Sequence, residues 1–357
     1  MKILHVTEAA EYGVLRHLSL ITGEMCRLGH QCRLLLYGSR IDSNAAMPCP
    51  VIVHPQNGNR LKNLLDSIRA TRKVCFDFKP DIIHLHAFAA GVAGRLAFKG
   101  CVYSPHAFAV HKSISLPVRM AVNFMERLLR RRTGAYALVS ASERNVALSM
   151  CLPSSKLQIF SNGLPDGFSD TLYLREEGRR KLGEQYPGIF SWTGKVGIFP
   201  GRLCSQKHPE AVIAALSSLG AAAPRVVFCG DGPLFDSLKN CGLNTVFFTG
   251  GVPELWRYLR AFDFAVMPSL YEGHSYSYLE CLAAGLPIAT TSANACSAED
   301  IPAGVLLSDP CNVEELAASM QKASELPNFN REAVTCSLSR QVEGLLKLYD
   351  MLAIASR

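Results

Sequence analysis

The feature that most constrains the fold is a repeated alternation of short apolar runs with amphipathic stretches. In the first half of the chain, Lys2–Val6, Gln31–Tyr37 and Asp81–Leu85 have the length and composition of buried strands. Stretches with helical periodicity separate them, such as Val14–Leu28, which ends at Gly29. A strand–helix–strand rhythm of this kind predicts a mostly parallel, doubly wound α/β sheet.

A break in the rhythm divides the chain into two such series. The length of 357 residues suits two domains, since a compact domain holds on the order of 100–200 residues. Between 162 and 195, turn signals surround one charged helix, predicted over Tyr173–Glu184. We therefore expect one domain over 1–165, an inter-domain segment over 166–194 and a second domain over 195–335. A C-terminal helix, covering 336–357, is expected to pack back on the first domain.

Composition narrows the class of protein. The net charge of +7 is modest, so it fits a phosphorylated substrate or an anionic membrane face and does not require nucleic acid. The 13 cysteines are scattered without C-x-x-C spacing, which indicates reduced thiols in a cytoplasmic protein. We find no secretory signal and no apolar run of about 18 residues. Neither half has G-x-G-x-x-G after its first strand, so a redox dinucleotide site is not supported.

Two glutamates, Glu272 and Glu280, lie eight positions apart in the most informative segment of the chain. The apolar run Phe262–Met267 precedes them as a buried strand, and an apolar helix follows. We expect the first glutamate in the strand-to-helix loop and the second in the first turn of the helix, where α/β sheets bind ligands. Glu272 suits sugar hydroxyls, Glu280 suits a ribose, and the N–H groups of Gly273-His274-Ser275 suit a diphosphate.

A structural interpretation of the same segment competes with this one. Ser277-Tyr-Leu-Glu280 fits the capping-box pattern S-x-x-E, in which Glu280 would only tie down the end of the helix. The rest of the chain favours the functional interpretation.

A basic pair follows the first strand of the second series. Arg202 comes directly after Gly201, and Lys207 lies five residues further on, just before Pro209, which opens a helix. A guanidinium, an ammonium and a helix N-terminus at one strand end are the groups that hold a diphosphate. The alternative is a solvated surface pair, and the position at a strand end favours function.

Histidines follow strands of the first series. His106 comes just after the strand expected over Cys101–Ser104, where it can donate to a substrate hydroxyl or phosphate. His84 and His86 flank another strand end, and the pattern alone does not separate these three residues. No H-x-x-x-H spacing occurs, and the nearest approach is His106 with His111, so no metal site is predicted.

Two further segments are candidates for binding. Glu8-Ala-Ala-Glu11-Tyr-Gly13 lies between the first strand and its helix, where Gly13 lets the backbone approach a ligand. The helix expected over Pro117–Arg132 interleaves arginines with apolar residues, a composition that suits an anionic membrane face as well as an ordinary solvated face. Its arginines are Arg119, Arg127, Arg130, Arg131 and Arg132.

In combination, these segments resemble the GT-B glycosyltransferases of family 4, over nearly the whole chain. The matched positions are Glu272 and Glu280 for the E-x7-E motif, Arg202 and Lys207 for the phosphate-binding pair, His106 for the acceptor-side histidine, Glu11-Tyr-Gly13 with His17 and Gly29-His30 for the glycine loop, Asn162-Gly163 for the turn before the linker, and Gly230–Pro233 for the G-D-G-P turn.

The resemblance implies two Rossmann-like domains facing a central cleft, the first on the acceptor side and the second binding the nucleotide sugar. It implies retaining, metal-independent transfer of a hexose from a donor, expected to be a UDP-sugar. The acceptor would be a hydroxyl of a glycan or lipid-linked oligosaccharide in bacterial surface polysaccharide synthesis (O-antigen, capsule or exopolysaccharide). Arg202 and Lys207 would stabilise the leaving diphosphate, and His106 would contact the donor sugar or phosphate. The protein would work in the cytoplasm or on the inner face of the cytoplasmic membrane.

The chain departs from the family pattern at three places, and two other functions stay open. Glu272-Gly273-His274-Ser275 replaces the common Glu-Gly-Phe-Gly, the first loop has one glycine where two are usual, and Ala293-Asn294-Ala295 with Glu299 replaces G-G-x-x-E. These changes leave the sugar undetermined. The alternatives are a nucleotide-sugar epimerase of the same fold and a catalytically silent partner subunit of another transferase.

Overall fold

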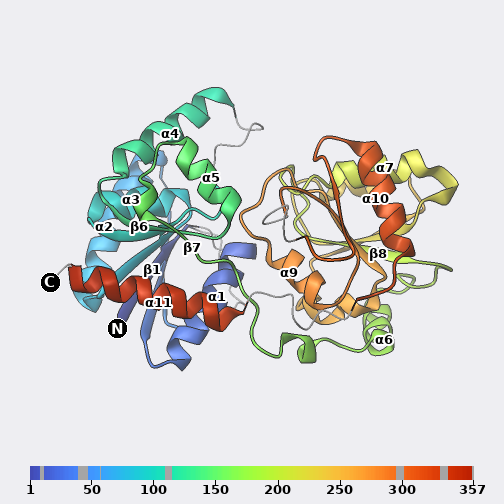
Figure 1. Cartoon of the computed structure of the whole chain (residues 1–357), viewed down its shortest axis with the longest axis horizontal. Helices are drawn as coiled ribbons and strands as arrows, with labels where there is room; N and C mark the ends of the chain where they lie inside the picture. Colours follow the sequence, from blue (N-terminus) through green and yellow to red (C-terminus); the bar gives the residue numbers. More distant parts are fainter. Residues whose placement is uncertain are drawn as a thin grey trace. The chain divides into compact units, whose positions relative to one another are not determined.

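The computed structural model describes residues 1–8, 12–38, 47–56, 58–108, 115–294, 301–329 and 337–355. The chain divides into two compact units, one of Met1–Pro165 with Cys336–Arg357 and one of Asp166–Thr335. Each unit has its own parallel sheet with helices packed on it (Figure 1). The two parallel-sheet α/β units confirm the predicted fold class.

In the first unit, the described strands form one sheet in the order β3-β2-β1-β4-β5-β6-β7. Its strands are β1 Lys2–Thr7, β2 Gln31–Tyr37, β3 Val51–His54, β4 Ile82–His86, β5 Cys101–Ser104, β6 Thr133–Leu138 and β7 Leu157–Ile159. All neighbouring strands run parallel. The central strands are buried on both faces, as is typical of parallel sheets covered by helices.

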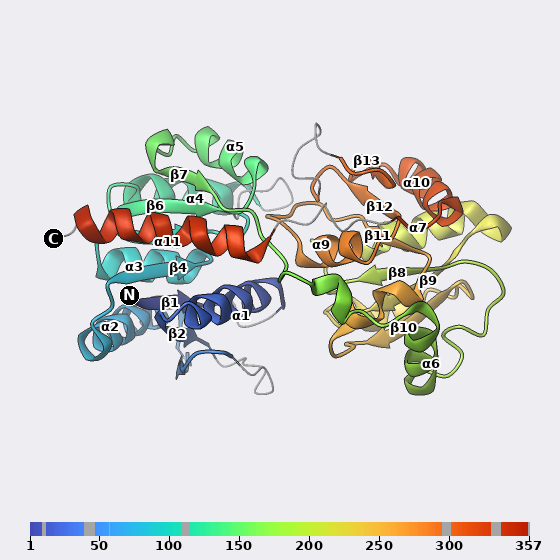
Figure 2. The same cartoon turned by 60° about the horizontal axis from the view of Figure 1, so that its bottom comes forward.

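Helices cover both faces of this first sheet. They are α1 Tyr12–Arg27, α2 Arg60–Phe78, α3 Phe88–Ala97, α4 Leu116–Leu129, α5 Ala141–Ser149 and α11 Leu338–Ala355, with the short 3-10 turn η1 Ser154–Lys156. Helices α1 and α11 lie side by side and share one apolar core with the strands (Figure 2). Helices α2 and α3 contribute to the core on the opposite face. The expected start of the C-terminal helix, at 336, lies outside the described residues.

In the second unit, the described strands form a sheet in the order β10-β9-β8-β11-β12-β13. The strands are β8 Val196–Pro200, β9 Arg225–Cys229, β10 Val246–Gly250, β11 Phe264–Met267, β12 Ile288–Thr291 and β13 Val305–Ser308. The helices are α6 Arg175–Gln185, α7 Pro209–Leu219, α8 Phe235–Lys239, α9 Tyr276–Ala283 and α10 Val313–Glu325, with 3-10 segments η2 Phe168–Thr171, η3 Gly220–Ala222 and η4 Leu255–Ala261. Helices α7 and α10 pack on the core of one face.

The segment expected to connect the domains is part of the second unit. Helix α6 is held there by its charges: the Asp263 carboxylate accepts from Arg175 Nη2 at 2.7 Å and from Arg179 Nη2 at 3.3 Å. The same carboxylate accepts the Val196 backbone N–H at 2.8 Å, at the start of β8. Two charged residues of this helix therefore dock it on the second unit through ion pairs.

The two sheets share one topological property. In each, the strand order reverses beside the first strand, between β1 and β4 in the first sheet and between β8 and β11 in the second. Ligands of open α/β sheets bind at the carboxyl ends of the strands that flank such a switch point. The segments around these four strand ends are therefore where a site is expected in each unit.

Candidate active site

Three loops meet at the carboxyl edge of the second sheet, after β8, β9 and β10. The Leu203 N–H donates to the Asp231 carbonyl at 2.9 Å, and the Asp231 carboxylate accepts the Gly251 N–H at 2.7 Å. The loops approach so closely that a Cβ on Gly230 would lie 2.1 Å from the Gly201 carbonyl oxygen. Only glycine fits such an approach, which gives the G-D-G turn a physical reason.

The loop after β8 carries both predicted phosphate-binding cations. Arg202 follows Gly201 directly, and its carbonyl accepts the Cys204 N–H at 3.0 Å. The Cys204 carbonyl in turn accepts the Lys207 N–H at 3.0 Å, immediately before α7. The guanidinium-bearing and ammonium-bearing residues thus belong to one folded turn at the carboxyl end of β8.

Gln206 joins this loop to the loop after β11. Its backbone carbonyl accepts the Leu270 N–H at 2.9 Å, and its side-chain amide donates to the Tyr271 carbonyl at 3.0 Å. The two loops of the switch point are thereby fixed side by side. As a result, Lys207 Nζ lies 2.6 Å from Glu272 Oε1. The structure brings these two predicted site residues into direct contact.

Helix α9 decides between the two interpretations of Glu280. The helix begins at Tyr276, and its N-cap is Ser275, whose side chain makes no capping hydrogen bond. Ser277 lies inside the helix and cannot be the N-cap, so the capping-box alternative is wrong. Glu280 is the fifth residue of the helix, one position beyond the first turn where it was expected, and its side chain is half-buried.

The residues between the two glutamates are more enclosed than an open loop. Gly273 is half-buried, whereas His274 and Ser275 are buried. Burial lowers the pKa of His274 to about 4, so its imidazole is neutral at physiological pH. The residue that replaces the family's aromatic side chain therefore contributes a neutral ring to this loop.

In the first unit, His106 lies in the loop after β5 on a left-handed backbone. Its φ is 51°, and that of Ala107 is 81°, a conformation that costs energy outside glycine. Buried Glu143 holds the turn, because its carboxylate accepts the Ala107 N–H at 2.7 Å and the Val139 N–H at 2.8 Å. Burial raises the pKa of Glu143 to about 7. Ser140 caps α5 by accepting the Glu143 N–H at 3.2 Å, while the Glu143 side chain holds the His106 loop.

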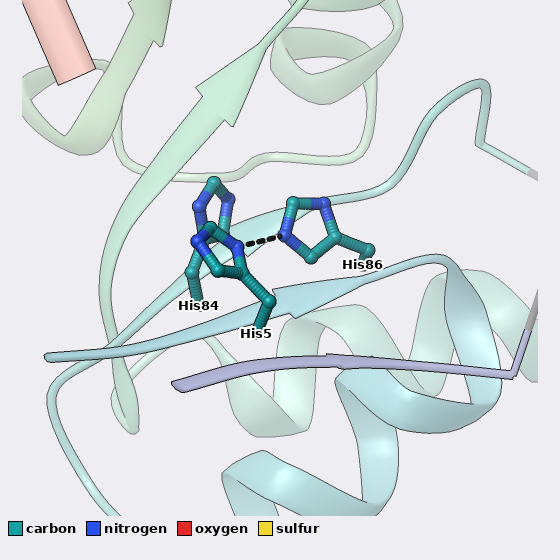
Figure 3. A group of neighbouring side chains, drawn as sticks. All are labelled: His5, His84 and His86. Carbon is teal, nitrogen blue, oxygen red and sulfur yellow. Dashed lines mark hydrogen bonds between the residues drawn. The ribbon is translucent and has the colours of Figure 1, made fainter. Parts of the chain in front are cut away.

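His106 belongs to a group of imidazoles that the sequence did not predict. The ring nitrogens of His5, His84 and His86 lie within 4.8 Å of one another (Figure 3), as do those of His17, His86 and His106. His86 is the last residue of β4, at the expected strand end, whereas His84 lies two residues earlier within the strand. His111 lies outside the described residues. The period-two spacing of His84 and His86 inside an apolar strand was the available signal.

The predicted glycine loop has a different structure from the one expected. Gly13 is an exposed residue in the first turn of α1, and nothing lies within 4 Å of the position of a Cβ on it. Glu11 lies outside the described residues, as do Ala295 and Glu299. Glu8 has a structural role, because its carboxylate accepts the backbone N–H groups of Ala89 and Ala90, at 2.6 and 2.8 Å.

Helix α4 has an inverted distribution of side chains. It buries Glu126, which forms a bidentate ion pair with buried Arg95 at 2.7 and 2.8 Å. Its exposed residues are apolar and basic: Met120 is 64% exposed and Phe124 is 67% exposed. They are accompanied by exposed Leu116, Val118, Arg127, Leu128 and Arg131. By contrast, Arg130 donates to the Cys151 carbonyl and Arg132 to the carbonyls of Arg95 and Leu96.

Two family models match the chain. "Glycosyltransferase Family 4" matches residues 12–167, and "Glycosyl transferases group 1" matches residues 194–325. Together they cover most of both units. The chain therefore belongs to the GT-B glycosyltransferases, as the resemblance of its motifs predicted.

Sequence relatives are distant and longer. The chain is 25% identical over 272 residues to sulfoquinovosyl transferase SQD2 of Arabidopsis thaliana, covering 72% of this chain and 50% of the relative. It is 28% identical over 258 residues to a putative teichuronic acid biosynthesis glycosyltransferase, TuaC, of Bacillus subtilis, covering 69% and 62%. To an Escherichia coli UDP-Gal:alpha-D-GlcNAc-diphosphoundecaprenol alpha-1,3-galactosyltransferase the identity is 23% over 252 residues, covering 66% and 62%. The chain thus spans half to about three-fifths of their lengths.

Solved structures share the fold over almost the full chain. Anabaena HepE in complex with UDP and glucose superposes with a TM-score of 0.77 at 17% identity, covering 98% of this chain and 99% of that one. WaaG, a glycosyltransferase involved in lipopolysaccharide biosynthesis, gives a TM-score of 0.70 at 16% identity, covering 99% and 95%.

Proposed function

We propose that the chain is a retaining glycosyltransferase that moves a sugar from a nucleoside diphosphate sugar, with UDP as the nucleotide, to a hydroxyl of a glycan or lipid-linked acceptor. The observation that carries the proposal is the Lys207–Glu272 contact of 2.6 Å at the switch point of the second sheet. A cation for the diphosphate and a carboxylate for the sugar are fixed next to each other there. The UDP complex of the HepE structure and the nucleotide-sugar activity named for the Escherichia coli relative support the donor class.

Different residues of the second unit contact different parts of the donor. Arg202 and Lys207 stabilise the negative charge that develops on the leaving diphosphate, since preorganised charges act most strongly where charge appears during the reaction. Glu272 accepts hydrogen bonds from the sugar, and Glu280 accepts them from the ribose. The transition state resembles an oxocarbenium ion, as in glycoside hydrolysis. The start of α9 suits a phosphate, because the N-terminus of a helix favours an anion.

His106 supplies a neutral contact from the first unit. Burial and the nearby His17 hold its pKa well below the ordinary value for histidine, so it donates a hydrogen bond to a sugar hydroxyl or phosphate without adding charge.

The acceptor proposal is an oligosaccharide of bacterial surface polysaccharide synthesis, reached at the inner face of the cytoplasmic membrane. The named activities of the TuaC and Escherichia coli relatives support the acceptor class. The exposed apolar and basic face of α4 supports surface docking, because arginines beside Phe124 and Met120 match an anionic headgroup layer. None of the described helices combines the length and the apolar character needed to cross a bilayer.

The test is incubation of the purified protein with single nucleotide sugars in the absence of acceptor. A transferase slowly hydrolyses its donor, an epimerase converts the sugar without releasing it, and a silent partner subunit does neither. A thermal-shift screen selects the donor first, since a ligand at about 100 times its Kd stabilises the folded state by about 2.7 kcal/mol. Slow release of UDP from one sugar supports the proposal. Conversion of the sugar without release, or no turnover of any donor that binds, would reject it.

A further inference from the structure

A column of polar side chains runs to the carboxyl edge of the first sheet at its switch point. In the parallel register, His5 of β1 pairs with His84 of β4, and Thr7 pairs with His86. Paired residues of parallel strands share a face, and alternate residues of one strand do as well. His5, His84 and His86 therefore lie together (Figure 3). All three are buried, on the face of the sheet whose apolar core includes residues of α1 and α11. Each ring is neutral, because burial lowers all three pKa values far below the ordinary one.

His84 is closed off by its own hydrogen bonds. The Ser104 hydroxyl donates its hydrogen to the Ala137 carbonyl at 2.6 Å. Its oxygen can therefore only accept from His84 Nε2, which lies 2.9 Å away. The proton of the neutral ring therefore sits on Nε2. His84 Nδ1 then accepts from the Tyr349 hydroxyl at 2.6 Å. Both nitrogens are satisfied within the core, so His84 is not part of the hydrogen-bond chain that reaches His106.

His86 instead links two other imidazoles. Its Nε2 lies 3.0 Å from His5 Nδ1, and its Nδ1 lies 2.9 Å from His106 Nε2. A neutral ring has one N–H and one lone pair, so the three rings form a chain with only two proton arrangements. Either every ring donates outward, toward His106, or every ring donates inward, toward His5. The direction determines which nitrogen of His106 carries the proton.

The inner end of the chain selects the direction. His5 Nε2 is buried and has no hydrogen-bond partner in the described part of the chain. In the inward arrangement this atom would be an unpaired buried N–H, whereas in the outward arrangement it is an unpaired lone pair. Orphaned N–H groups are the rarer of the two in protein interiors. The outward arrangement is therefore favoured, with Nδ1 of His106 protonated and Nε2 accepting from His86.

We propose that His86, with His5 behind it, is a positioning residue that fixes His106 as the Nδ1-protonated tautomer and so makes it a hydrogen-bond donor in sugar transfer. The proposal rests on the proposed function for the role of His106 and on the hydrogen-bond geometry for its tautomer. In the opposite tautomer, Nδ1 of His106 would offer a lone pair, which cannot donate to a hydroxyl or phosphate oxygen.

The same geometry argues against a metal ion in the column. Both three-histidine groups share His86, and both of its nitrogens are already hydrogen-bonded to imidazoles. A ligand set with His84 would also have to break its bonds to Tyr349 and Ser104. Hydrogen bonding between the rings therefore accounts for the group without a metal ion. The experiments below also test whether the group binds a metal ion.

The primary measurement is the position of the His106 ring proton. Long-range proton–nitrogen NMR of protein labelled with nitrogen-15 in histidine reports which ring nitrogen is protonated, and His106→Gln assigns the signals. We expect Nδ1–H in the parent protein. In His86→Gln we expect a mixture of tautomers, because an amide can donate or accept. His84→Gln is the matched control, two residues away in the same strand and equally buried, and should leave His106 unchanged. If His86→Gln does not fold, His86→Phe is measured in its place.

Three results would overturn the proposal. These are an Nε2-protonated His106 in the parent, an equal response to His84→Gln and His86→Gln, or binding of one Zn²⁺ per chain that His86→Gln abolishes.

A second measurement separates this proposal from the proposed function. On donor hydrolysis, His86→Gln should lower kcat/KM about tenfold to hundredfold relative to His84→Gln, as is usual for residues that orient a functional imidazole. Equal kcat/KM in the two variants would overturn the positioning role. If the parent turns over no nucleotide sugar, the proposed function fails while the NMR result still decides the tautomer.

Discussion

The two sheets have matching strand orders around the switch point, yet their polar groups lie in different places: within a strand in the first sheet and in loops in the second. In the first sheet the strand after the switch point, β4, carries His84 and His86 within its buried interior. In the second sheet the corresponding strand, β11, is apolar throughout. The polar groups there, Lys207 and Glu272, lie in loops beyond the strand ends and pair with each other.

This difference follows from the cost of burying charge. An imidazole can be neutral and can satisfy its nitrogens with neighbouring rings, so histidines can stand inside a strand. A lysine or glutamate that keeps its charge costs several kcal/mol to bury without a partner. The first unit therefore offers neutral hydrogen bonds at its switch point, whereas the second offers charge.

The largest predicted effect is a difference in acid stability between the units. The pKa is lowered for buried His5, His17, His84, His86 and His106, so below about pH 6.5 these five rings bind up to five more protons in the unfolded chain than in the folded one. Half-buried His30 shifts in the same direction. Glu143 and Glu8 have raised pKa values and oppose this with two protons held in the folded state. Five less two leaves three, or about 4 kcal/mol lost per pH unit at the steepest. Among the described histidines of the second unit, His274 is the one with a lowered pKa, which gives about 1.4 kcal/mol lost per pH unit.

The two tryptophans allow the units to be followed separately. Both Trp192 and Trp256 lie in the second unit, so their fluorescence reports it alone, while far-UV circular dichroism reports both. Between pH 6 and pH 4, ellipticity should fall before tryptophan fluorescence changes. Coincident transitions would show that the histidines do not distinguish the units.

The next largest effect concerns the charge site. Lys207→Ala and Glu272→Gln should each lower donor turnover about 10²–10³-fold, the cost of removing one preorganised contact to developing charge. Folding should be retained, because both residues lie in loops outside the core. Lys347→Ala is the matched control, since Lys347 also forms a lysine–glutamate pair, at 2.7 Å to Glu343, but on the exposed face of α11. Near-parent turnover in either site variant would remove that residue from the proposed mechanism.

The fold could be predicted from the sequence where a single segment determines its own structure. Gln31–Tyr37 has the predicted bounds and α7 begins at Pro209 as predicted, because an apolar run between turn residues and a proline-initiated helix are local signals. A contrasting case is η4, where Leu255–Ala261 forms a 3-10 helix and an α-helix would fit the sequence as well. Helical periodicity does not distinguish the two over so short a length.

The histidine chain could not be predicted, because it depends on pairing across the sheet. His5 and His86 are 81 positions apart and meet only through the register of β1 with β4. Likewise, Gln206 gives no signal in the sequence, and its role depends on two loops folding against each other. Motifs identified the charged residues, and the tertiary structure identified the residues that orient them.

A smaller effect is expected for the surface of α4. Neutralising Arg127 and Arg131 together, as Arg→Gln, should weaken binding to anionic vesicles by about 2 kcal/mol, at about 1 kcal/mol for each cation near the surface. Arg130 is left unchanged because it bonds to the Cys151 carbonyl. Raised salt should weaken binding of the parent similarly. The control, Arg69→Gln with Arg180→Gln, removes the same charge from other exposed helices. Equal co-sedimentation of the two double variants would reject docking through α4.

The smallest predicted effect is that of chelation, which should leave turnover within about twofold of the untreated enzyme. In the second unit Arg202 and Lys207 provide the positive charge that a divalent ion would otherwise bring to the diphosphate. In the first unit His86, the residue shared by both candidate ligand sets, already uses both ring nitrogens. Turnover after dialysis against EDTA, with Mg²⁺, Mn²⁺ or Zn²⁺ added back separately, is the measurement. Loss restored by Mg²⁺ or Mn²⁺ would place an ion at the diphosphate and weaken the role given to the basic pair. Loss restored only by Zn²⁺ would instead point to the imidazoles, and would reverse the contrast drawn between a neutral first unit and a charged second one.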